Sequence, residues 1–342
     1  MKKKILVTGG TGYIGSHTTV ELIERGFDVV IVDNLYNSEA NVVDRIQKIT
    51  GVKPILEVFD LCDLVKLDRF IQKHKDISAV IHFAAFKAVG ESVHKPLDYY
   101  RNNLMSLINI LEVMKRYSIP DLVFSSSCTV YGQPEKLPVT EDAPLQPATS
   151  PYGNTKQICE AIIKDTTTSD KNVKAISLRY FNPIGAHPSA LIGELPKGVP
   201  ENLVPFLTQT GYGIREELKV FGDDYDTPDG SCIRDYLHVV DLAKAHVVAV
   251  NRLIEGKNKS EYEIFNLGTG IGVSVLEAIK SFEHVSGVKL KYKIVERRAG
   301  DIEKIWADPS FANKELGWKT LSSLDEAMKT AWDWEKAIRV NK

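Results

Sequence analysis

The sequence has no long hydrophobic run, few cysteines and no excess of charge of one sign. No segment approaches the roughly 20 consecutive apolar residues that a membrane-spanning helix needs. Lys2, Lys3 and Lys4 resemble the basic start of a signal peptide, but the apolar stretch that follows is too short for one. The formal net charge of -2 argues against bulk binding to nucleic acid or to an acidic membrane. We therefore expect neither a membrane nor a nucleic acid as partner.

The four cysteines, at positions 62, 128, 159 and 232, show no CxxC spacing and no neighbouring histidines at metal-ligand spacing. This pattern predicts no metal site and favours a reduced, cytoplasmic protein. The chain has 342 residues, of which 43% are hydrophobic and 26% charged. These values are typical of a soluble globular protein, and the length favours about two domains.

The chain does contain a glycine-rich turn between a predicted strand and a predicted helix. The run Lys4-Ile5-Leu6-Val7-Thr8 predicts a buried parallel strand, and apolar residues at helical spacing follow the glycines up to Gly26. Gly9, Gly12 and Gly15 suit a tight turn that lets the backbone approach a pyrophosphate at a helix N-terminus. Strand, glycine turn, helix and second strand form a dinucleotide-binding unit, although a tight turn without a ligand would give the same residues.

Asp33 follows the second apolar run, Val29-Val30-Ile31-Val32. An acid at this strand end can accept hydrogen bonds from a ribose 2′-hydroxyl and repels a 2′-phosphate. No arginine stands beside it to accommodate that phosphate, so NAD is favoured over NADP. The alternative for Asp33 is an ordinary residue of a surface turn.

The alternation of short apolar strands with helices continues along the first half of the chain. Strands are predicted near 54–59, 79–83, 122–124 and 173–178, with helices around 63–75, 97–117 and 152–168. This pattern predicts an α/β fold with a doubly wound parallel (Rossmann) sheet, in which ligands bind at the carboxyl ends of the strands.

The pattern changes after about Phe181. Residues 181–235 are rich in Pro, Gly and Asn, 236–254 is expected to be a helix, and 264–267 a short strand. We expect residues 1–180 to form the cofactor domain, with return segments near 236–254 and 264–270. Residues 181–342 are expected to form a smaller mixed α/β substrate domain. Asp223-Asp224-Tyr225-Asp226 is expected to be a solvated loop.

Tyr152 and Lys156 stand four residues apart at the start of a predicted helix, so both side chains lie on one helical face. A phenol with a pKa of about 10 is a poor base at neutral pH, but a nearby ammonium and a nicotinamide ring favour the phenolate. Ser127 ends a predicted strand, where its hydroxyl could share a proton with a substrate. In isolation Tyr-x-x-x-Lys arises often by chance; with the glycine turn and Ser127 it predicts proton-transfer chemistry.

These motifs resemble those of the UDP-galactose 4-epimerase family, within the extended short-chain dehydrogenases/reductases. The resemblance runs nearly end to end. The matching blocks are VTGGTGYIGSHT at 7–18, VDNLYNS at 32–38, VIHFAAFKAVGESVHKPLDYY at 80–100, SSSCTVYG at 125–132, SPYGNTK at 150–156, RYFNPIGAHPS at 179–189, RDYLHVVDLA at 234–243 and NLGTGIGVSV at 266–275. KAVGESV and RYFNPIGAHPS are the blocks most specific to the epimerases.

The resemblance implies a reaction and a set of site residues. Tyr152, aided by Ser127 and Lys156, would remove the proton of a hexose 4-hydroxyl while NAD takes and later returns a hydride. The residues implied to hold NAD are Gly9, Gly12, Tyr13, Ile14, Gly15, Asp33, Asn34, Asn37, Ser38, Asp60, Leu61, Phe83, Ala84, Lys87, Asn102, Tyr152, Lys156 and Phe181. Those implied to hold a UDP-hexose are Lys87, Ser127, Tyr152, Asn182, Asn202, Phe221, Arg234, Tyr236, Arg298, Asp301 and Ile305. A homodimer is implied by analogy alone.

Several other interpretations of the function and of single residues stay open. Related sugar-nucleotide dehydratases carry an Asp-Glu pair after the strand-end serine or threonine, and related decarboxylases a glutamate, whereas this chain has Cys128-Thr129. A non-catalytic NAD-binding regulator would typically lack the tyrosine or the lysine. Arg234 and Arg298 could be members of surface ion pairs, Lys87 a solvated lysine, and Asn102 an ordinary polar helix residue.

Ile305 occupies a position where the family varies in bulk. Family members with a tyrosine there use only UDP-glucose and UDP-galactose, whereas members with a small residue also accept N-acetylated sugars. The intermediate isoleucine predicts good UDP-galactose activity and weak UDP-N-acetylgalactosamine activity.

Overall fold

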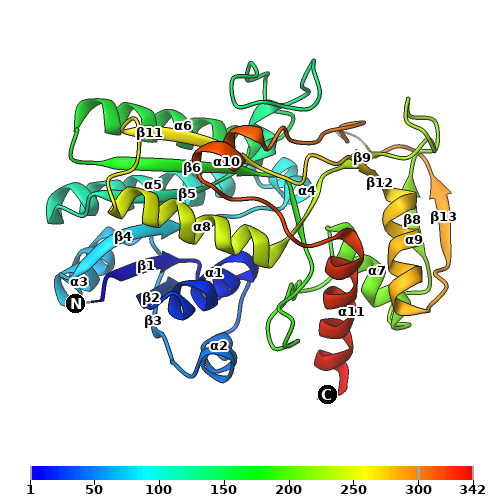
Figure 1. Ribbon diagram of the computed structural model, residues 1–342, viewed down its shortest axis with the longest axis horizontal. Helices are drawn as coiled ribbons and strands as arrows, with labels where there is room; N and C mark the ends of the chain where they lie inside the picture. The colour runs from blue at the N-terminus through cyan, green and yellow to red at the C-terminus, as the bar shows by residue number, and fades with distance from the viewer. Residues whose placement is uncertain (1, 299–300, 341–342) are drawn as a thin grey trace. The chain divides into compact units, whose positions relative to one another are not determined.

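The computed structural model describes residues 2–298 and 301–340, which fall into two compact units (Figure 1). Unit 1 comprises the chain up to Gly132 together with Leu145–Arg179 and Ala243–Phe265. Unit 2 comprises Gln133–Pro144, Tyr180–Leu242 and the residues from Asn266 onward. Each unit is therefore assembled from separate stretches of the chain.

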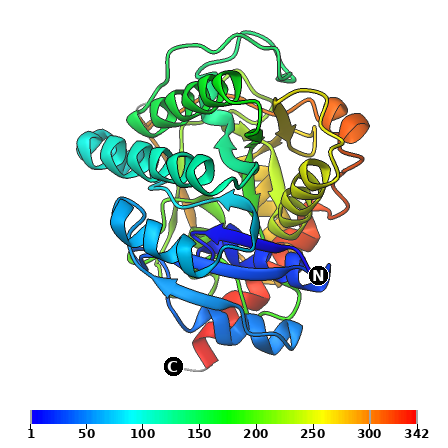
Figure 2. The ribbon, with the colours of Figure 1, turned by 90° about the vertical axis from the view of Figure 1, so that its left-hand side faces the viewer.

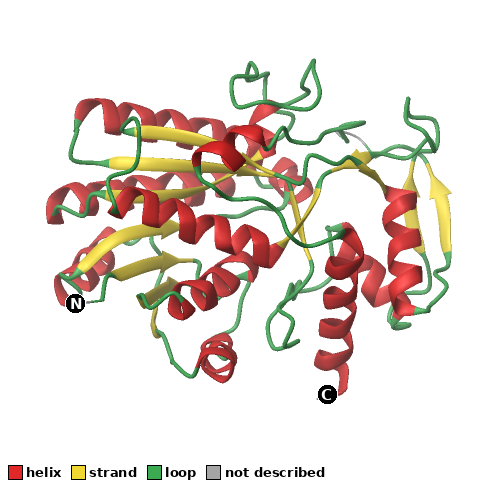
Figure 3. Cartoon of the chain, in the orientation of Figure 1, coloured by secondary structure: helices red, strands yellow, loops and turns green. Residues whose placement is uncertain are grey.

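A seven-stranded sheet forms the centre of unit 1 (Figure 3), with the strand order β11-β6-β5-β4-β1-β2-β3. The registers of β1 with β2, β1 with β4, β2 with β3 and β4 with β5 are parallel. The chain builds one half of the sheet outward from β1 and then returns to build the other from β4, so β1 and β4 meet at the switch point. The strands are β1 (Lys4–Thr8), β2 (Asp28–Asp33), β3 (Ile55–Val58), β4 (Ile77–His82), β5 (Asp121–Ser127), β6 (Lys174–Tyr180) and β11 (Tyr262–Leu267).

Helices cover both faces of this sheet (Figure 2). Buried Leu6, Val80 and Leu122 of the sheet share one apolar cluster with Leu107 of α5 and Ile163 of α6. The opposite face is covered by α1 and by the part of α8 from Ala243 onward. The helices are α1 (Tyr13–Glu24), α2 (Val42–Thr50), α3 (Leu64–Lys73), α4 (Val89–His94), α5 (Pro96–Tyr117), α6 (Pro151–Ser169) and α8 (Val239–Ile254), with a 3₁₀ turn at Cys128–Tyr131.

The start of α6 follows from local sequence. The Ser150 hydroxyl accepts a hydrogen bond from the Gly153 amide at 3.1 Å, and Pro151 occupies the first turn, where its missing N–H costs nothing. The helix therefore begins at a fixed residue. This fixes the place of Tyr152 in its first turn.

Unit 2 has a smaller core, in which Leu207 of α7, Phe282 of α9 and Met328 and Trp332 of α11 pack together. The rings of Phe282 and Trp332 meet edge-on, with centroids 5.5 Å apart. Its elements are β7 (Asn182–Ile184), α7 (Leu203–Gly211), β8 (Leu218–Phe221), β9 (Ile233–Arg234), β10 (Tyr236–His238), β12 (Val273–Ser274), α9 (Val275–Ser286), β13 (Tyr292–Val295), α10 (Ser310–Glu315) and α11 (Leu324–Val340).

The predicted Rossmann sheet is confirmed, strand by strand, in unit 1. The expectation of one helix over 236–254 is wrong at its start, because Tyr236–His238 forms β10 and pairs in parallel with Asn182–Ile184 before α8 begins at Val239. The irregular stretch 181–235 also contains a helix, α7, whose early Pro205 is tolerated within the first turn.

Candidate active site

The glycine loop between β1 and α1 forms a cradle that admits no side chain. Gly9 has φ +69, and its amide donates to the Val32 carbonyl at 2.8 Å. A Cβ on Gly15 would lie 2.2 Å from the Gly9 carbonyl oxygen, and one on Gly9 would lie 2.9 Å from the Ala84 amide nitrogen. The loop is thus closely packed at the switch point between β1 and β4.

Helix α1 begins directly after this loop, at Tyr13, followed by Ile14. No side chain caps its N-terminus at Gly12, and no acidic residue lies in its first turn. The amides of the first turn and the partial positive charge of the helix end therefore suit a phosphate. These features fit a pyrophosphate-containing cofactor such as NAD.

Asp33 ends β2 with its carboxylate fixed by the neighbouring loop. One oxygen accepts from the Leu35 amide at 2.9 Å and the Ser38 hydroxyl at 3.0 Å, and the other from the Thr11 amide at 3.2 Å. These contacts bring Asp33 and Ser38 against the glycine loop. The carboxylate oxygens retain further lone pairs that could accept from a ribose hydroxyl.

Asn34 and Asp60 meet beside this carboxylate, since the Asn34 amide donates to Asp60 at 3.2 Å. Asn37 is exposed in the same loop, and Leu61 is buried. The structure therefore brings these residues, all predicted to hold NAD, to the carboxyl ends of β2 and β3.

The segment after β4 lies over the same edge of the sheet. The Phe83 amide donates to the Thr8 carbonyl at 3.1 Å, and the Ala84 amide approaches the Thr8 hydroxyl at 3.4 Å. The Lys87 ammonium lies 5.9 Å from the centre of the Tyr13 ring. Lys87 is thereby held beside the start of α1.

Asn103, which the sequence did not single out, fixes this segment. Its side chain accepts from the Phe86 amide at 2.8 Å and donates to the Phe86 carbonyl and the Thr155 hydroxyl, each at 3.0 Å. The predicted Asn102 donates to the Asn103 side chain at 3.0 Å. A signal existed in the sequence: Asn103 lies one helical turn after Tyr99, on the buried face of α5.

Ser127 and Tyr152 lie at the carboxyl end of β5 and in the first turn of α6, and both are buried. The Ser127 hydroxyl accepts from the Thr129 amide at 3.2 Å. The Lys156 ammonium donates to the Ser125 carbonyl at 2.6 Å and lies 5.9 Å from the centre of the Tyr152 ring. Lys156 thus connects the two elements that carry Ser127 and Tyr152.

Burial dominates the electrostatics of Lys156. Loss of solvent lowers the pKa of its ammonium to about 8, while the nearby Cys159 and Glu160 act in the opposite direction. The amine therefore still holds its proton for the most part at neutral pH. Lys156 thus places a cation 5.9 Å from the centre of the Tyr152 ring.

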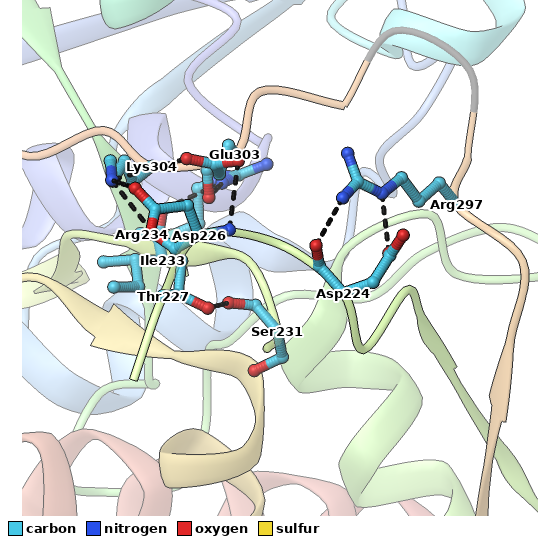
Figure 4. Close-up of polar contacts among 9 residues, drawn as sticks. All are labelled: Asp224, Asp226, Thr227, Ser231, Ile233, Arg234, Arg297, Glu303 and Lys304. Carbon is cyan, nitrogen blue, oxygen red and sulfur yellow. Dashed lines mark hydrogen bonds and ion pairs between the residues drawn. The ribbon is translucent and has the colours of Figure 1, made fainter. Parts of the chain in front are cut away.

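Unit 2 contains most of the residues predicted to hold the UDP-sugar, whereas Lys87, Ser127 and Tyr152 of that set lie in unit 1. Figure 4 shows the polar contacts around Arg234. The Arg234 guanidinium donates to the Ile233 carbonyl at 2.8 Å. Ile305 lies beside Ile233, because its amide donates to the same Ile233 carbonyl at 3.2 Å. The Ile305 side chain is buried. Tyr236, on β10, is paired with Asn182 of β7.

Asp235 lies between β9, which ends at Arg234, and β10, which begins at Tyr236. Its fully buried carboxylate accepts from the Thr269 amide and hydroxyl at 2.8 and 2.7 Å, from the Gly270 amide at 3.1 Å and from the Ala307 amide at 3.2 Å. Burial raises the pKa of Asp235, and these hydrogen bonds act against that rise.

Arg298, Asp301 and Phe221 form a second group in unit 2. The Arg298 guanidinium reaches Asp301 at 2.7 Å and lies 5.4 Å from the centre of the Phe221 ring. The Asn202 side chain donates to Glu194 at 2.7 Å. The ion-pair alternative thus describes Arg298 in this structure, although a diphosphate could compete with Asp301 for it.

The remaining predicted residue, Phe181, is buried in unit 2, where its amide donates to the Leu267 carbonyl. The aspartates of the predicted solvated loop are exposed, whereas Tyr225 is buried under the Arg297 guanidinium, 4.0 Å from the ring centre. Within residues 2–298 and 301–340, no cluster of three His, Cys, Asp or Glu could hold a metal ion, and no helix is long and apolar enough to cross a membrane.

Comparison with known proteins places this geometry in a family. Residues 6–331 match the family model described as GDP-mannose 4,6 dehydratase. The chain is 49% identical over 342 residues to UDP-glucose 4-epimerase of Bos taurus, covering 98% of this chain and 97% of that protein. It is also 49% identical over 333 residues to the Bacillus subtilis UDP-glucose 4-epimerase, covering 97% of each.

Solved structures agree. A UDP-glucose 4-epimerase from Stenotrophomonas maltophila, with bound NAD and formylated UDP-arabinopyranose, superposes with a TM-score of 0.96 at 46% identity, covering 99% of this chain and 100% of that one. The Bifidobacterium longum enzyme, in complex with NAD+ and UDP, gives a TM-score of 0.93 at 46% identity and covers 98% of each chain. The chain therefore belongs to the UDP-glucose 4-epimerase family, the NAD-dependent epimerases of the extended short-chain dehydrogenases/reductases.

Proposed function

We propose that the protein interconverts UDP-galactose and UDP-glucose by inverting C4 of the hexose. The observation that carries this proposal is the group formed by Ser127 at the carboxyl end of β5 and by Tyr152 and Lys156 in the first turns of α6, with Lys156 hydrogen-bonded to β5. Relatives that match this chain over nearly its whole length carry the same activity in their names.

In the proposed reaction Tyr152 acts as the base and later as the acid at the sugar 4-oxygen. Its phenolate takes the hydroxyl proton, and the Ser127 hydroxyl hydrogen-bonds to the same oxygen. NAD bound to the glycine loop of unit 1 would supply the hydride acceptor and donor for C4, so that the hexose would pass through a 4-keto form. Lys156 stabilises the phenolate through its charge, and Tyr152 then gives the proton back.

We propose that unit 1 binds NAD and unit 2 binds the UDP moiety. Arg234 and Arg298 suit diphosphate oxygens, because a guanidinium offers paired donors in a fixed fork. Binding through the nucleotide leaves the hexose free to turn over between proton removal and return, so anchoring and chemistry act on different parts of the substrate.

Dehydration is the main alternative, since the matching family model takes its name from a dehydratase. That chemistry needs a carboxyl group after the strand-end serine. Here Cys128 and Thr129 follow Ser127 and supply none. The same absence argues against a decarboxylase, and the presence of Tyr152 with Lys156 argues against a non-catalytic regulator.

We also propose a homodimer formed through α4 and α5. These helices expose several apolar side chains, with Val93 57%, Leu97 72% and Met105 41% accessible. A second copy of the chain would cover these side chains, and light scattering of wild type and a Leu97→Glu/Met105→Glu variant tests the proposal. The four cysteines are free, which suits the reducing cytoplasm where we expect the enzyme.

The test of function is incubation of the purified protein with UDP-galactose, without added reductant, followed by NMR of the sugar. We expect UDP-glucose to appear with no net build-up of NADH. Tyr152→Phe should fold as wild type and lose nearly all turnover. An unchanged rate in that variant, or no turnover by wild type with NAD bound, would overturn the proposal.

A further inference from the structure

Two consecutive residues near the end of β5, Ser125 and Ser126, are hydrogen-bonded to α6. The Ser125 carbonyl accepts from Lys156 at 2.6 Å, and the Ser126 hydroxyl donates to the Glu160 carboxylate at 2.5 Å. Ser127 then ends the strand. Lys156 and Glu160 are one helical turn apart, so one face of α6 fixes the two residues that precede the catalytic serine.

Glu160 is also bound from the other side, by β6. Arg179 donates Nε to one carboxylate oxygen at 2.9 Å and a terminal nitrogen to the other at 2.5 Å. The two side chains are 4% and 6% exposed, so the pair is buried. Nothing in the proposed chemistry uses either residue.

Arg179 extends these contacts to the 3₁₀ turn that follows Ser127. Its second terminal nitrogen donates to the Tyr131 hydroxyl at 3.0 Å, and its guanidinium lies 4.9 Å from the centre of the Tyr131 ring. Ser127 therefore lies between two anchors, Ser126 on one side and Tyr131 on the other. Ser126 is hydrogen-bonded to Glu160 of the buried ion pair, and Tyr131 to Arg179.

Stability alone explains this arrangement poorly. A buried ion pair often contributes no more than a well-packed apolar pair of the same volume, because the desolvation of two charges offsets their attraction. What such a pair adds is a defined geometry, since the bidentate fork sets distance and direction together.

Glu160 also places a negative charge near Lys156, and this charge favours the ammonium form of the lysine. The groups facing Lys156 are His82 of β4 and Tyr152, Cys159 and Glu160 of its own helix. Burial lowers the pKa of His82 to about 3 and raises that of Cys159 to about 12, so both are neutral at pH 7. The negative charge that favours the ammonium therefore comes from Glu160, with Arg179 of β6 offsetting part of it.

We propose that Glu160 and Arg179 are positioning residues for the catalytic group, holding the end of β5 against α6 so that Ser127 and Lys156 keep their places. Glu160 in addition keeps Lys156 charged. This inference rests on the proposed function, and it deepens the account of the same site.

The chain offers a matched control in the same unit. Arg252 and Glu263 form another buried bidentate pair, with distances of 2.7 and 2.8 Å and side chains 9% exposed, between α8 and β11. Glu160→Gln and Glu263→Gln thus make the same chemical change in similar surroundings. Their unfolding by urea, their kcat and KM for UDP-galactose, and the pH dependence of kcat are measured side by side.

We expect both variants to lose stability to a similar extent. Glu160→Gln should in addition lower kcat roughly 10- to 100-fold with little change in KM, the cost of a misplaced catalytic group. The alkaline limb of its pH profile of kcat should also shift to lower pH, because the pKa of Lys156 is lower without the negative charge of Glu160. Glu263→Gln should keep the kcat and the pH profile of wild type.

Two further variants keep the inference testable if Glu160→Gln folds poorly. Ser126→Ala removes one hydrogen bond and leaves the ion pair intact, and Glu160→Asp keeps the charge but cannot span both partners. Both should lower kcat, and Glu160→Asp should retain the wild-type pH profile better than Glu160→Gln. Equal kcat in these variants and wild type would overturn the positioning role.

The Lys156 charge can be followed without turnover. NMR titration of lysine-labelled protein, with the Lys156 signal assigned from a Lys156→Arg sample, should give a lower pKa in Glu160→Gln than in Glu263→Gln. An identical pKa in the two would refute the electrostatic part. If wild type fails to convert UDP-galactose, the proposed function falls, yet this titration still decides whether Glu160 holds the charge of Lys156.

Discussion

Gly15→Ala tests the glycine loop directly, because the added methyl group would meet backbone on two sides. Its Cβ would lie 2.2 Å from the Gly9 carbonyl oxygen and 2.8 Å from the Gly10 Cα, where an ordinary contact starts at 3.4 Å. Neither atom belongs to a flexible side chain, so the loop itself must move by about 1 Å. Overpacking of this kind costs about 1–3 kcal/mol.

The cost should appear mainly in cofactor binding, since the displaced loop and the first turn of α1 form the proposed pyrophosphate cradle. With about 1.4 kcal/mol for each factor of ten, we expect the Kd for NAD to rise roughly 10- to 100-fold. Isothermal titration calorimetry on cofactor-free protein measures this, and thermal unfolding reports on stability.

Two other glycines calibrate the result. At Gly26, with φ +86, a Cβ would meet nothing within 4 Å, so Gly26→Ala should lower stability through backbone strain and leave NAD affinity unchanged. At Gly12 the Cβ would lie 3.2 Å from the Gly9 oxygen, so Gly12→Ala should be intermediate. If folded Gly15→Ala binds NAD as tightly as wild type, the cradle has been misassigned.

Three further predictions concern other parts of the chain. Ile305→Gly should raise activity on UDP-N-acetylgalactosamine relative to UDP-galactose, and an unchanged ratio of kcat/KM would remove Ile305 as a specificity residue. Burial raises the pKa of Asp121 to about 6, so in the folded protein its ionised form is disfavoured. Asp121→Asn should therefore be about 1–2 kcal/mol more stable than wild type at pH 7.5. This gain should fade as the pH falls from 6 to 4, because Asp121 is then protonated in the folded wild type. A gain that does not depend on pH in urea unfolding would contradict this. Arg297→Ala removes the exposed pair with Asp224 at 2.7 Å, which should leave the free energy of unfolding nearly unchanged yet speed hydrogen exchange in the loop around Tyr225. Unchanged exchange there would show that the pair does not hold the loop.

Much of unit 1 could be predicted because its signals are local. Each strand is a short apolar run, and the residue that ends it, such as Asp33 or Ser127, falls where a parallel sheet presents its functional groups. The glycine turn and the Tyr152–Lys156 spacing are equally local. The roles of these residues in binding and catalysis stay predictions.

What the sequence did not show depends on partners far along the chain. Tyr236–His238 looks like the start of α8 until Asn182–Ile184 is brought beside it, and pairing over that separation leaves no periodic pattern. No local pattern gives Asn103, Glu160 or Arg179 a role, because their importance follows from contacts with other strands and helices. Glu160 did leave one trace: it continues the four-residue spacing of Tyr152 and Lys156 on a single helix face.

The chain crosses between the two units five times, and this has a consequence for its synthesis on the ribosome. Unit 1 receives α8 after Ala243 and its edge strand near Phe265, and unit 2 needs Thr269, Gly270 and Ala307 to satisfy the Asp235 carboxylate. Neither unit can therefore close while the first 240 residues alone have emerged. The nascent protein must hold an open sheet edge, with a half-built second unit attached, until its final quarter is translated.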